Sequence, residues 1–333
     1  MKARMRWAAV LLDVLLLLFP LYACNAMPAE YQVDLIIKST ESEYWQSVYA
    51  GAQAAAGTYR VNVNFMGPKE EKDYREQREF IEEAVAREPD AVILAAGDFS
   101  LMAEPMERVA DAGIPVVMID SFVNSDKWKA SVSTDNYEAG RILAQEMAKR
   151  LPRGGKIGII GFVQNASPGI EREQGFRDYM ESQPGFSVET VLYCDSNVDT
   201  AAEQTLQILD RSSGIVAIAG LNAQAATGAA RALDQAGQED VLLGGIDCMV
   251  EEAAYVEKGI LDVAVLQNPY MMGYYSVETA YKILTERPYE KSVYTDVTVV
   301  DRENLFSKEH QQLIFPFTGP AGSTGENTME SIS

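Results

Sequence analysis

Polar side chains that can bind hydroxyl groups recur along this sequence just after short apolar stretches. They are Ser39, Ser42, Asp98 and Asp120 in the first half, and Arg172, Asn222, Asp247 and Gln267 in the second half. Carboxylates, amides and guanidinium groups are planar and can bond two neighbouring hydroxyls at once. The adjacent rings of Tyr44 and Trp45 could lie against the C–H face of a sugar ring. Tyr44 and Trp45 with the nearby hydroxyls of Ser39 and Ser42 therefore predict a sugar-binding site, and the other polar residues are candidates for a ligand site.

Each of these residues, taken alone, also fits an ordinary structural role. An Asp that follows a strand is common turn chemistry. The pair Tyr44 and Trp45 could simply cap a helix and pack in the core. Arg172 is different, because it lies near the start of a predicted helix, where a cation opposes the helix dipole. Its position therefore favours a role in ligand binding over a role in stability.

The residues that most catalytic sites require are scarce. The sequence has one histidine, His310, so Ser-His, Cys-His and His-metal sites are poorly supplied. It also has no glycine-rich phosphate loop. We therefore predict a binding protein with no catalytic residues, no enzymatic activity, no cofactor and no metal site. Cys194 and Cys248 are predicted to be unpaired, because three strand spacings of the expected sheet separate them.

The polar residues need strands and helices to position them. Val33–Ile37 is apolar except for Asp34 and alternates too little for a half-exposed strand, so we predict a strand buried on both faces. The segment Lys38–Glu43 breaks this run, and apolar residues then recur at helical spacing from Tyr44 to Ala52. In open α/β sheets, ligands bind outside the carboxyl ends of such strands. Further strands of the first half are predicted at Val61–Phe65, Ala91–Leu94, Pro115–Ile119 and Ala130–Ser133, with helices at Asp73–Arg87 and Leu101–Ala112.

The same alternation then restarts with a predicted helix at Asn136–Arg150. Strands are predicted at Lys156–Gly161, Val188–Tyr193, Ile215–Ala219, Leu242–Ile246 and Asp262–Leu266, with helices between them. A final helix at Tyr270–Thr285 and a β-rich run at Val293–Val300 follow. The sequence therefore predicts an α/β protein in which one doubly wound parallel-sheet architecture is used twice.

The first residues have the parts of a secretory signal. Three basic residues precede an apolar run, Trp7–Phe19, which contains one charge, Asp13. The run is shorter than the roughly 20 residues of a spanning helix. The sequence Leu21-Tyr-Ala-Cys24 resembles the lipobox of bacterial lipoproteins, in which the cysteine is lipidated. We therefore predict a lipoprotein signal peptide at 1–24, lipidation of Cys24 and a tether at 25–30, with an uncleaved membrane anchor as the alternative.

The charge of the chain excludes some classes of partner. The formal net charge is −21, and removal of residues 1–24 would make it −23. Such an acidic protein is repelled by nucleic acid and by anionic membrane surfaces. We therefore expect contact with a membrane through the lipid anchor alone. The segment 318–333 is rich in Gly, Ser and Thr and is predicted to be a disordered tail.

The order of motifs from Val33 to Asn304 resembles the type I periplasmic sugar-binding proteins, which are ribose- and galactose-binding-like. The matching motifs are Ser39-Thr40 with Tyr44-Trp45 and Gly51-Ala52, Pro89-Asp-Ala-Val-Ile-Leu94, Ala112-Gly-Ile-Pro-Val-Val117 with Asp120-Ser121, Thr134-Asp-Asn136 with Gly140, Arg172-Glu-Gln-Gly-Phe176, Gly244-Gly-Ile-Asp247, and Gln267-Asn-Pro-Tyr-Met-Met-Gly273.

This resemblance implies two lobes that close on a sugar about a hinge of three crossovers. The crossovers are expected near Thr134–Asn136, Gln267–Pro269 and Thr295–Val297. The implied N-terminal lobe is 31–134 plus 268–296, and the implied C-terminal lobe is 135–267 plus 297–317. The resemblance further implies that Tyr44 and Trp45 stack on the sugar, while Asp98, Arg172, Asn222, Asp247 and Gln267 bond its hydroxyls.

Two acidic side chains beside one Arg make the expected pocket unsuited to phosphorylated or carboxylated ligands. We therefore expect a neutral sugar or polyol, bound by a monomer that presents it to the permease of an ABC transporter. The alternative is a sugar-sensing subunit that presents the ligand to a histidine kinase or chemoreceptor. A LacI-type transcription factor is disfavoured, because the chain lacks an N-terminal helix-turn-helix and is acidic.

Overall fold

A computed structural model describes residues 29–314 of the chain. The first lobe contains β1 (Tyr31–Ile36), α2 (Glu43–Tyr59), β2 (Val61–Met66), α3 (Tyr74–Arg87), β3 (Ala91–Leu94), α4 (Ala103–Asp111), β4 (Val116–Ile119), β5 (Ala130–Thr134), α10 (Pro269–Leu284) and β11 (Ser292–Thr295). The second lobe contains α5 (Asn136–Arg150), β6 (Gly155–Gly161), α6 (Ser167–Ser182), β7 (Phe186–Tyr193), α7 (Val198–Arg211), β8 (Ile215–Gly220), α8 (Ala223–Ala236), β9 (Leu242–Ile246), α9 (Val250–Lys258), β10 (Val263–Leu266), β12 (Thr298–Val300) and α11 (Lys308–Ile314).

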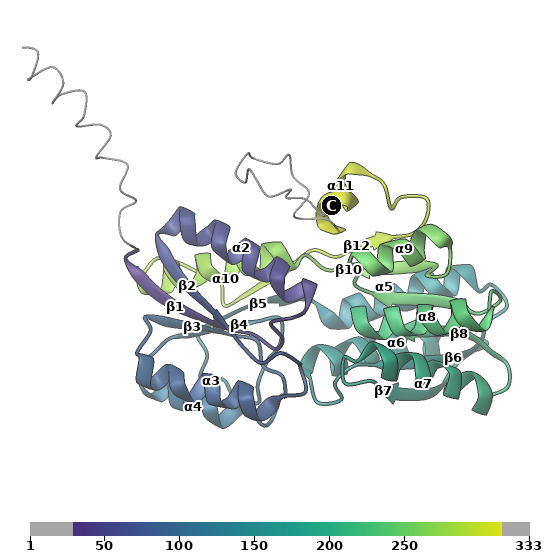
Figure 1. Cartoon of the computed structure of the whole chain (residues 1–333), viewed down its shortest axis with the longest axis horizontal. Helices are drawn as coiled ribbons and strands as arrows, with labels where there is room; N and C mark the ends of the chain where they lie inside the picture. The colour runs from purple at the N-terminus through teal and green to yellow at the C-terminus, as the bar shows by residue number, and fades with distance from the viewer. Residues whose placement is uncertain (1–28, 315–333) are drawn as a thin grey trace, which may run out of the picture.

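Each lobe is built on its own six-stranded sheet, and the lobes lie side by side (Figure 1). The strand order is β11-β5-β4-β3-β1-β2 in the first sheet and β12-β10-β9-β8-β6-β7 in the second. Every neighbouring pair is parallel except β10 and β12, which are antiparallel. The predicted architecture of two doubly wound lobes is therefore confirmed.

The chain passes between the two sheets at three places. It leaves the first sheet after β5 and enters α5, and it returns after β10 to form α10. The third passage lies between β11 and β12, which belong to different sheets and are separated by Asp296 and Val297. Three adjacent crossovers of this kind form a hinge about which two lobes can rotate.

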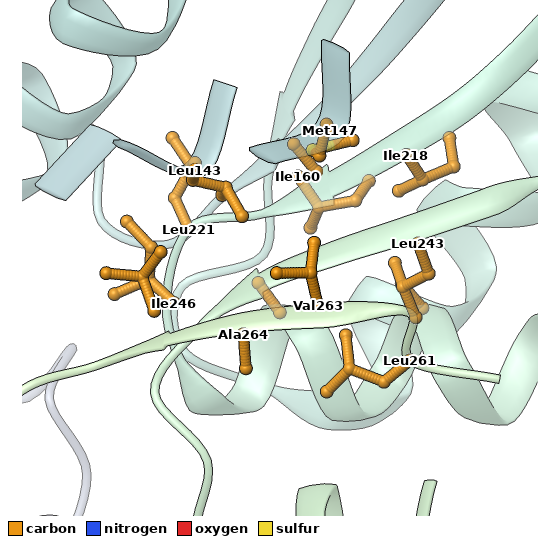
Figure 2. Packing of buried hydrophobic residues seen from close by; sticks show 14 of the residues in the cluster. Leu143, Met147, Ile160, Ile218, Leu221, Leu243, Ile246, Leu261, Val263 and Ala264 are labelled. Atoms are coloured by element: carbon orange, nitrogen blue, oxygen red, sulfur yellow. The ribbon is translucent and has the colours of Figure 1, made fainter. Parts of the chain in front are cut away.

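Helices cover both faces of each sheet, as buried strands without alternation require. In the first lobe, α2 and α10 pack on one face, while α3 and α4 pack on the other (Figure 1). In the second lobe the core is one large cluster. Figure 2 shows part of this cluster, where Leu143 and Met147 of α5 gather with side chains of the sheet such as Ile160 and Ile218.

Glycines let one pair of helices in each lobe approach closely. A Cβ atom on Gly51 of α2 would lie 1.8 Å from the carbonyl oxygen of Tyr270, at the start of α10. A Cβ atom on Gly175 of α6 would lie 2.0 Å from the carbonyl oxygen of Tyr137 in α5. Any larger residue would push these helices apart. Close helix packing thus explains why the motifs Gly51-Ala52 and Arg172–Phe176 contain glycine at positions 51 and 175.

Several predictions fall on residues that the structure does not describe. The signal peptide at 1–24 with Cys24, most of the tether at 25–30, and the tail at 318–333 lie outside residues 29–314. Within the described residues, Cys194 and Cys248 are both free and buried. No helix of this part of the chain is both long and apolar enough to span a membrane.

Candidate functional site

A small cavity lies between the lobes at the carboxyl ends of both sheets. Its lining residues are Lys38, Ser42, Tyr44, Trp45, Glu71 and Asp120 from the first lobe, Phe162, Pro168, Arg172, Asn222, Ala223, Gln224 and Asp247 from the second, and Gln267 from a crossover. Eight predicted site residues are therefore brought together: Ser42, Tyr44, Trp45, Asp120, Arg172, Asn222, Asp247 and Gln267.

Two carboxylates face this cavity from matching positions in the two lobes. Asp120 follows β4 and Asp247 follows β9. Both residues have left-handed backbone angles, with φ of 63° and 77°. Their amides donate to the carbonyl oxygens of Val132 and Val265, each at 2.9 Å. Left-handed residues other than glycine are uncommon and collect at functional sites, where the surrounding structure holds them in place.

Asp120 is held by two side chains of its own lobe. Its Oδ2 lies 2.7 Å from the ammonium of Lys38, and its Oδ1 accepts a 3.0 Å hydrogen bond from the hydroxyl of Tyr44. Burial by itself would raise the pKa of Asp120, but the charges of Lys38 and Arg172 and these hydrogen bonds outweigh it. The pKa therefore lies below its ordinary value, and the carboxylate is ionised at neutral pH.

Within the described part of the chain, no lysine or arginine forms an ion pair with Asp247. Its Oδ1 accepts a 2.7 Å hydrogen bond from the amide of Gln267, whose oxygen accepts from the hydroxyl of Thr134 at 2.9 Å. Burial raises the pKa of Asp247, and the charge of Arg172 with the bond from Gln267 offsets only part of this effect. The carboxyl group of the second lobe thus holds its proton to a higher pH than an ordinary aspartate.

Arg172 supplies the cation of the second lobe. Its side chain is buried, and Nε donates to Asn136 at 2.8 Å while Nη1 donates to the carbonyl oxygen of Leu221 at 2.9 Å. The guanidinium also lies 5.5 Å from the ring centre of Phe162. These bonds occupy two of its five N–H donors. The group is fixed in place and can still donate to a ligand.

The two aromatic rings are not arranged as a common stacking surface. The planes of Tyr44 and Trp45 meet at 82°, so a flat sugar ring could lie against only one of them. The Tyr44 hydroxyl is used on Asp120, and burial followed by the charge of Asp120 raises the pKa of Tyr44. Trp45 is 2% exposed and belongs to the core of the first lobe. Tyr44 and Trp45 therefore both pack in the core of the first lobe and line the cavity.

Asn222 is committed to local bonds on both ends of its amide. Its oxygen caps α8 by accepting from the amide of Ala225 at 2.9 Å. Its nitrogen donates to Ser196 at 3.1 Å and to Gln224 at 2.8 Å. A ligand hydroxyl would therefore have to replace one of these partners.

Two predicted site residues do not line the cavity. The hydroxyl of Ser39 donates to the carbonyl oxygen of Lys69 at 2.5 Å and so fixes a neighbouring loop. The carboxylate of Asp98 accepts from the amides of Ser100 and Leu101 at 2.8 and 2.7 Å. It stabilises the turn that leads into α4, which is the ordinary role of an Asp after a strand.

Six residues that line the cavity were not predicted: Lys38, Glu71, Phe162, Pro168, Ala223 and Gln224. The sequence could have located Lys38, because it directly follows Leu35-Ile-Ile37 and therefore lies near the carboxyl end of a buried strand. Phe162 directly follows the predicted strand Lys156–Gly161 and could have been located in the same way. Glu71 had no such signal, because its loop meets the second lobe only in the tertiary structure. With both cations included, Lys38 and Arg172 face Glu71, Asp120 and Asp247, so the acidic groups still outnumber the basic ones.

Among residues 29–314, no group of three or more His, Cys, Asp or Glu side chains is placed to hold a metal ion.

Comparisons with known proteins agree with this geometry. The family model described as periplasmic binding protein domain matches residues 33–288, and the chain belongs to this family. The ribose import binding protein of Bacillus subtilis (strain 168) is 24% identical over 299 residues, which cover 86% of this chain and 96% of the relative. A D-ribose/D-allose-binding protein of Pseudomonas aeruginosa is 25% identical over 287 residues, covering 83% and 90%.

Solved structures give the same result. An ABC transporter solute-binding protein from Agrobacterium vitis with bound D-fucose is 32% identical, with a TM-score of 0.82, and the match covers 85% of this chain and 100% of that one. A carbohydrate transporter solute-binding protein from Agrobacterium radiobacter in complex with D-arabinose is 28% identical, with a TM-score of 0.83 and coverage of 86% and 99%. The family is one of transport-associated binding proteins, and its members act outside the cytoplasm.

Proposed function

We propose that this protein captures a neutral sugar between its two lobes and presents it to the permease of an ABC transporter. The observation that carries the proposal is the convergence of Asp120 from one lobe with Asp247 and Arg172 from the other on one cavity. Planar groups from opposite sides can bond the hydroxyls around a ring. An additional negative charge on the ligand would be repelled by the acidic groups. Three of the proteins named above are described as import or transporter binding proteins, so we propose transport rather than sensing.

The size of the cavity indicates how the ligand enters. Its volume is about 30 Å³, far below the roughly 300–1,000 Å³ of small-molecule pockets. A sugar can therefore enter only when the lobes or the lining side chains move apart. Ligand contacts drawn from both lobes then favour the closed form by their higher affinity for it. The three crossovers supply the hinge for this motion, and we propose lobes of 31–134 plus 268–296 and 135–267 plus 297–317.

A thermal-shift screen tests the binding function. Neutral sugars, including D-ribose, D-arabinose, D-fucose and common hexoses and polyols, are compared with a sugar phosphate and a sugar acid. A ligand that binds only the folded protein stabilises it by about 2.7 kcal/mol when the ligand concentration is 100 times the Kd. This stabilisation raises the melting temperature. We expect at least one neutral compound to do so. Stabilisation by the anionic compounds alone would contradict the proposal.

We further propose that the protein is a monomer held at the outer face of a membrane by lipid on Cys24. The support is the lipobox-like sequence Leu21-Tyr-Ala-Cys24 and a family that acts outside the cytoplasm. Substitution Cys24→Ala should move the protein from the membrane fraction to the soluble fraction. Continued fractionation of the variant with membranes would favour an uncleaved anchor.

A further inference from the structure

One hydrogen bond crosses the cleft beside the candidate site. The hydroxyl of Ser196, in the second lobe, donates to Oε2 of Glu71, in the first lobe, at 2.6 Å. Among residues 29–314, the amide of Phe99 also donates to the Asn165 carbonyl oxygen and the amide of Phe122 to the Ser167 hydroxyl, but none of these four residues lines the cavity. The hydroxyls of Tyr44 and Thr134 donate to Gln267 at 3.5 and 2.9 Å, at a crossover between the lobes. The bond between Ser196 and Glu71 differs from these, because it joins a cavity residue to the opposite lobe away from the crossovers.

This bond is part of a longer chain that joins two cavity residues. On one side, the indole Nε1 of Trp45 donates to Oε1 of Glu71 at 3.3 Å. On the other side, the amide of Asn222 donates to the hydroxyl of Ser196 at 3.1 Å. A continuous path thus runs from Trp45 in the first lobe, through Glu71 and Ser196, to Asn222 in the second lobe.

Both loops that carry the central bond are held in position. The loop with Glu71 is fixed to the end of β1, because the Ser39 hydroxyl donates to Lys69 at 2.5 Å and the Thr40 amide donates to Pro68 at 2.8 Å. On the opposite side, Asp195 and Ser196 both have left-handed backbone angles, with φ of 49° and 54°. Such angles are uncommon for residues other than glycine and are kept where the surroundings require them.

We propose that Glu71 and Ser196 form a latch, which positions Trp45 and Asn222 and holds the lobes closed over the bound sugar. The proposal rests on the sugar-binding function proposed above. The latch exists only when the lobes are closed. It therefore stabilises the closed form and slows the release of the sugar, while the open form that captures the sugar is unaffected.

Stopped-flow kinetics on the purified protein tests the latch with whichever of D-ribose, D-arabinose and D-fucose binds. Tryptophan fluorescence reports the reaction. We expect Ser196→Ala to raise the dissociation rate about tenfold and to change the association rate less than twofold. Glu71→Gln, which keeps the shape and an acceptor oxygen, should raise the dissociation rate less. A residue that served only stability would lower the melting temperature and would not separate the two rates.

Two comparisons control this experiment. The hydroxyl of Ser187 donates to Glu189 at 2.9 Å within the second lobe, on the surface, so Ser187→Ala should leave both rates unchanged. The double variant Glu71→Ala with Ser196→Ala should release the sugar no faster than Glu71→Ala alone, because both changes remove the same bond. Additive effects of the two changes would show that the residues act separately and would overturn the latch.

A measurement without sugar separates this proposal from the binding function. Small-angle X-ray scattering of the sugar-free protein should show a larger radius of gyration for Ser196→Ala than for the wild type, since closed molecules become fewer. This result supports the latch even where none of the three sugars binds. Equal scattering and an unchanged dissociation rate in both Ser196→Ala and Glu71→Gln would overturn the latch and leave sugar binding standing.

Discussion

The two lobes place a carboxylate at the same point of the same sheet, yet give it different surroundings. In the first lobe Ile36 pairs with Leu94 and Leu94 with Met118, two residues before Asp120. In the second lobe Ile160 pairs with Gly220 and Gly220 with Gly245, two residues before Asp247. The backbones of the two aspartates have the same left-handed angles and equivalent hydrogen bonds. The scaffold thus fixes where the carboxylates lie.

The neighbouring side chains decide what those carboxylates do. Two residues beyond Ile36 the first lobe has Lys38, and two residues beyond Ile160 the second lobe has Phe162. The ammonium lies 2.7 Å from Asp120 and, with Arg172, brings its pKa below the ordinary value. Phe162 offers Asp247 no charge, and burial raises the pKa of that group. Matched backbones therefore present one ionised carboxylate and one that is easier to protonate.

The largest effect is expected from Lys38→Met, which makes the first lobe resemble the second. Removing one partner of a buried ion pair costs about 3–5 kcal/mol, and both side chains here are nearly inaccessible. The pKa of Asp120 should then rise above its ordinary value. The loss of stability should therefore be larger at pH 8 than at pH 4, as measured by urea unfolding.

The double variant Lys38→Met with Asp120→Asn is the control for this change, because it leaves no unpaired charge. It should recover a large part of the lost stability at pH 8. A single variant as stable as the wild type at both pH values would show that the two lobes do not differ in the way described.

Arg172→Ala should have the next largest effect, on sugar affinity. The guanidinium lowers the pKa of both Asp120 and Asp247, so its loss affects both lobes. Truncation of such a buried, hydrogen-bonded charge costs roughly 2–5 kcal/mol of binding, which is at least a thirtyfold loss of affinity. Isothermal titration calorimetry measures the change, and circular dichroism checks that the fold is intact.

Arg177→Ala is the matched control, since Arg177 lies on the same helix and pairs with Glu173 near the surface. It should bind sugar as the wild type does. Undiminished affinity in Arg172→Ala would remove this residue from the site.

Glu252→Gln tests an element that the first lobe lacks. Helix α9 follows β9, whereas β4 leads to β5 without a helix. Glu252 bonds the Thr227 hydroxyl and the Met249 amide, and burial raises its pKa from 4.5 to about 7. The folded protein keeps this proton where the unfolded chain releases it, so stability is lost as pH rises from about 4.5 to 7.

The neutral Gln avoids that loss. The stability of Glu252→Gln relative to the wild type should therefore be about 3 kcal/mol more favourable at pH 8 than at pH 4.5. Thermal unfolding across this range measures the difference. A difference between the two proteins that does not change with pH would contradict the assignment to this carboxyl group.

Smaller effects should come from the glycines at the two matched helix contacts. Added methyl groups in Gly51→Ala and Gly175→Ala would meet backbone oxygens, and overpacking costs about 1–3 kcal/mol. Gly57 lies on the same helix as Gly51, and an added Cβ there would meet no atom of residues 29–314 beyond its own neighbouring helix backbone. Gly57→Ala should therefore stabilise the protein by about 0.5–1 kcal/mol. Equal melting temperatures for Gly51→Ala and Gly57→Ala would show that the close helix contact is absent.

The fold was predictable because it depends on local patterns. Ile215–Ala219 is apolar throughout, and Val33–Ile37 is apolar except for Asp34. Such runs are typical of strands covered on both faces. The alternation of these runs with helices restarts once, at Asn136–Arg150, and two matched sheets follow from that repetition. The aspartates after β4 and β9 were found for the same reason, because the end of a strand can be read from the sequence.

The sequence by itself determined the architecture and most of the residues that face the cleft, since both depend on the order of apolar and polar positions along each strand and helix. Only the tertiary structure decided which of these polar groups are free. Ser39 and Asp98 are bonded to nearby backbone groups, and Lys38 is joined to Asp120, 82 positions away. Glu71 reaches Ser196 across 125 positions. The physical reason is that a side chain's partner depends on distance in space, which no local pattern of residues contains.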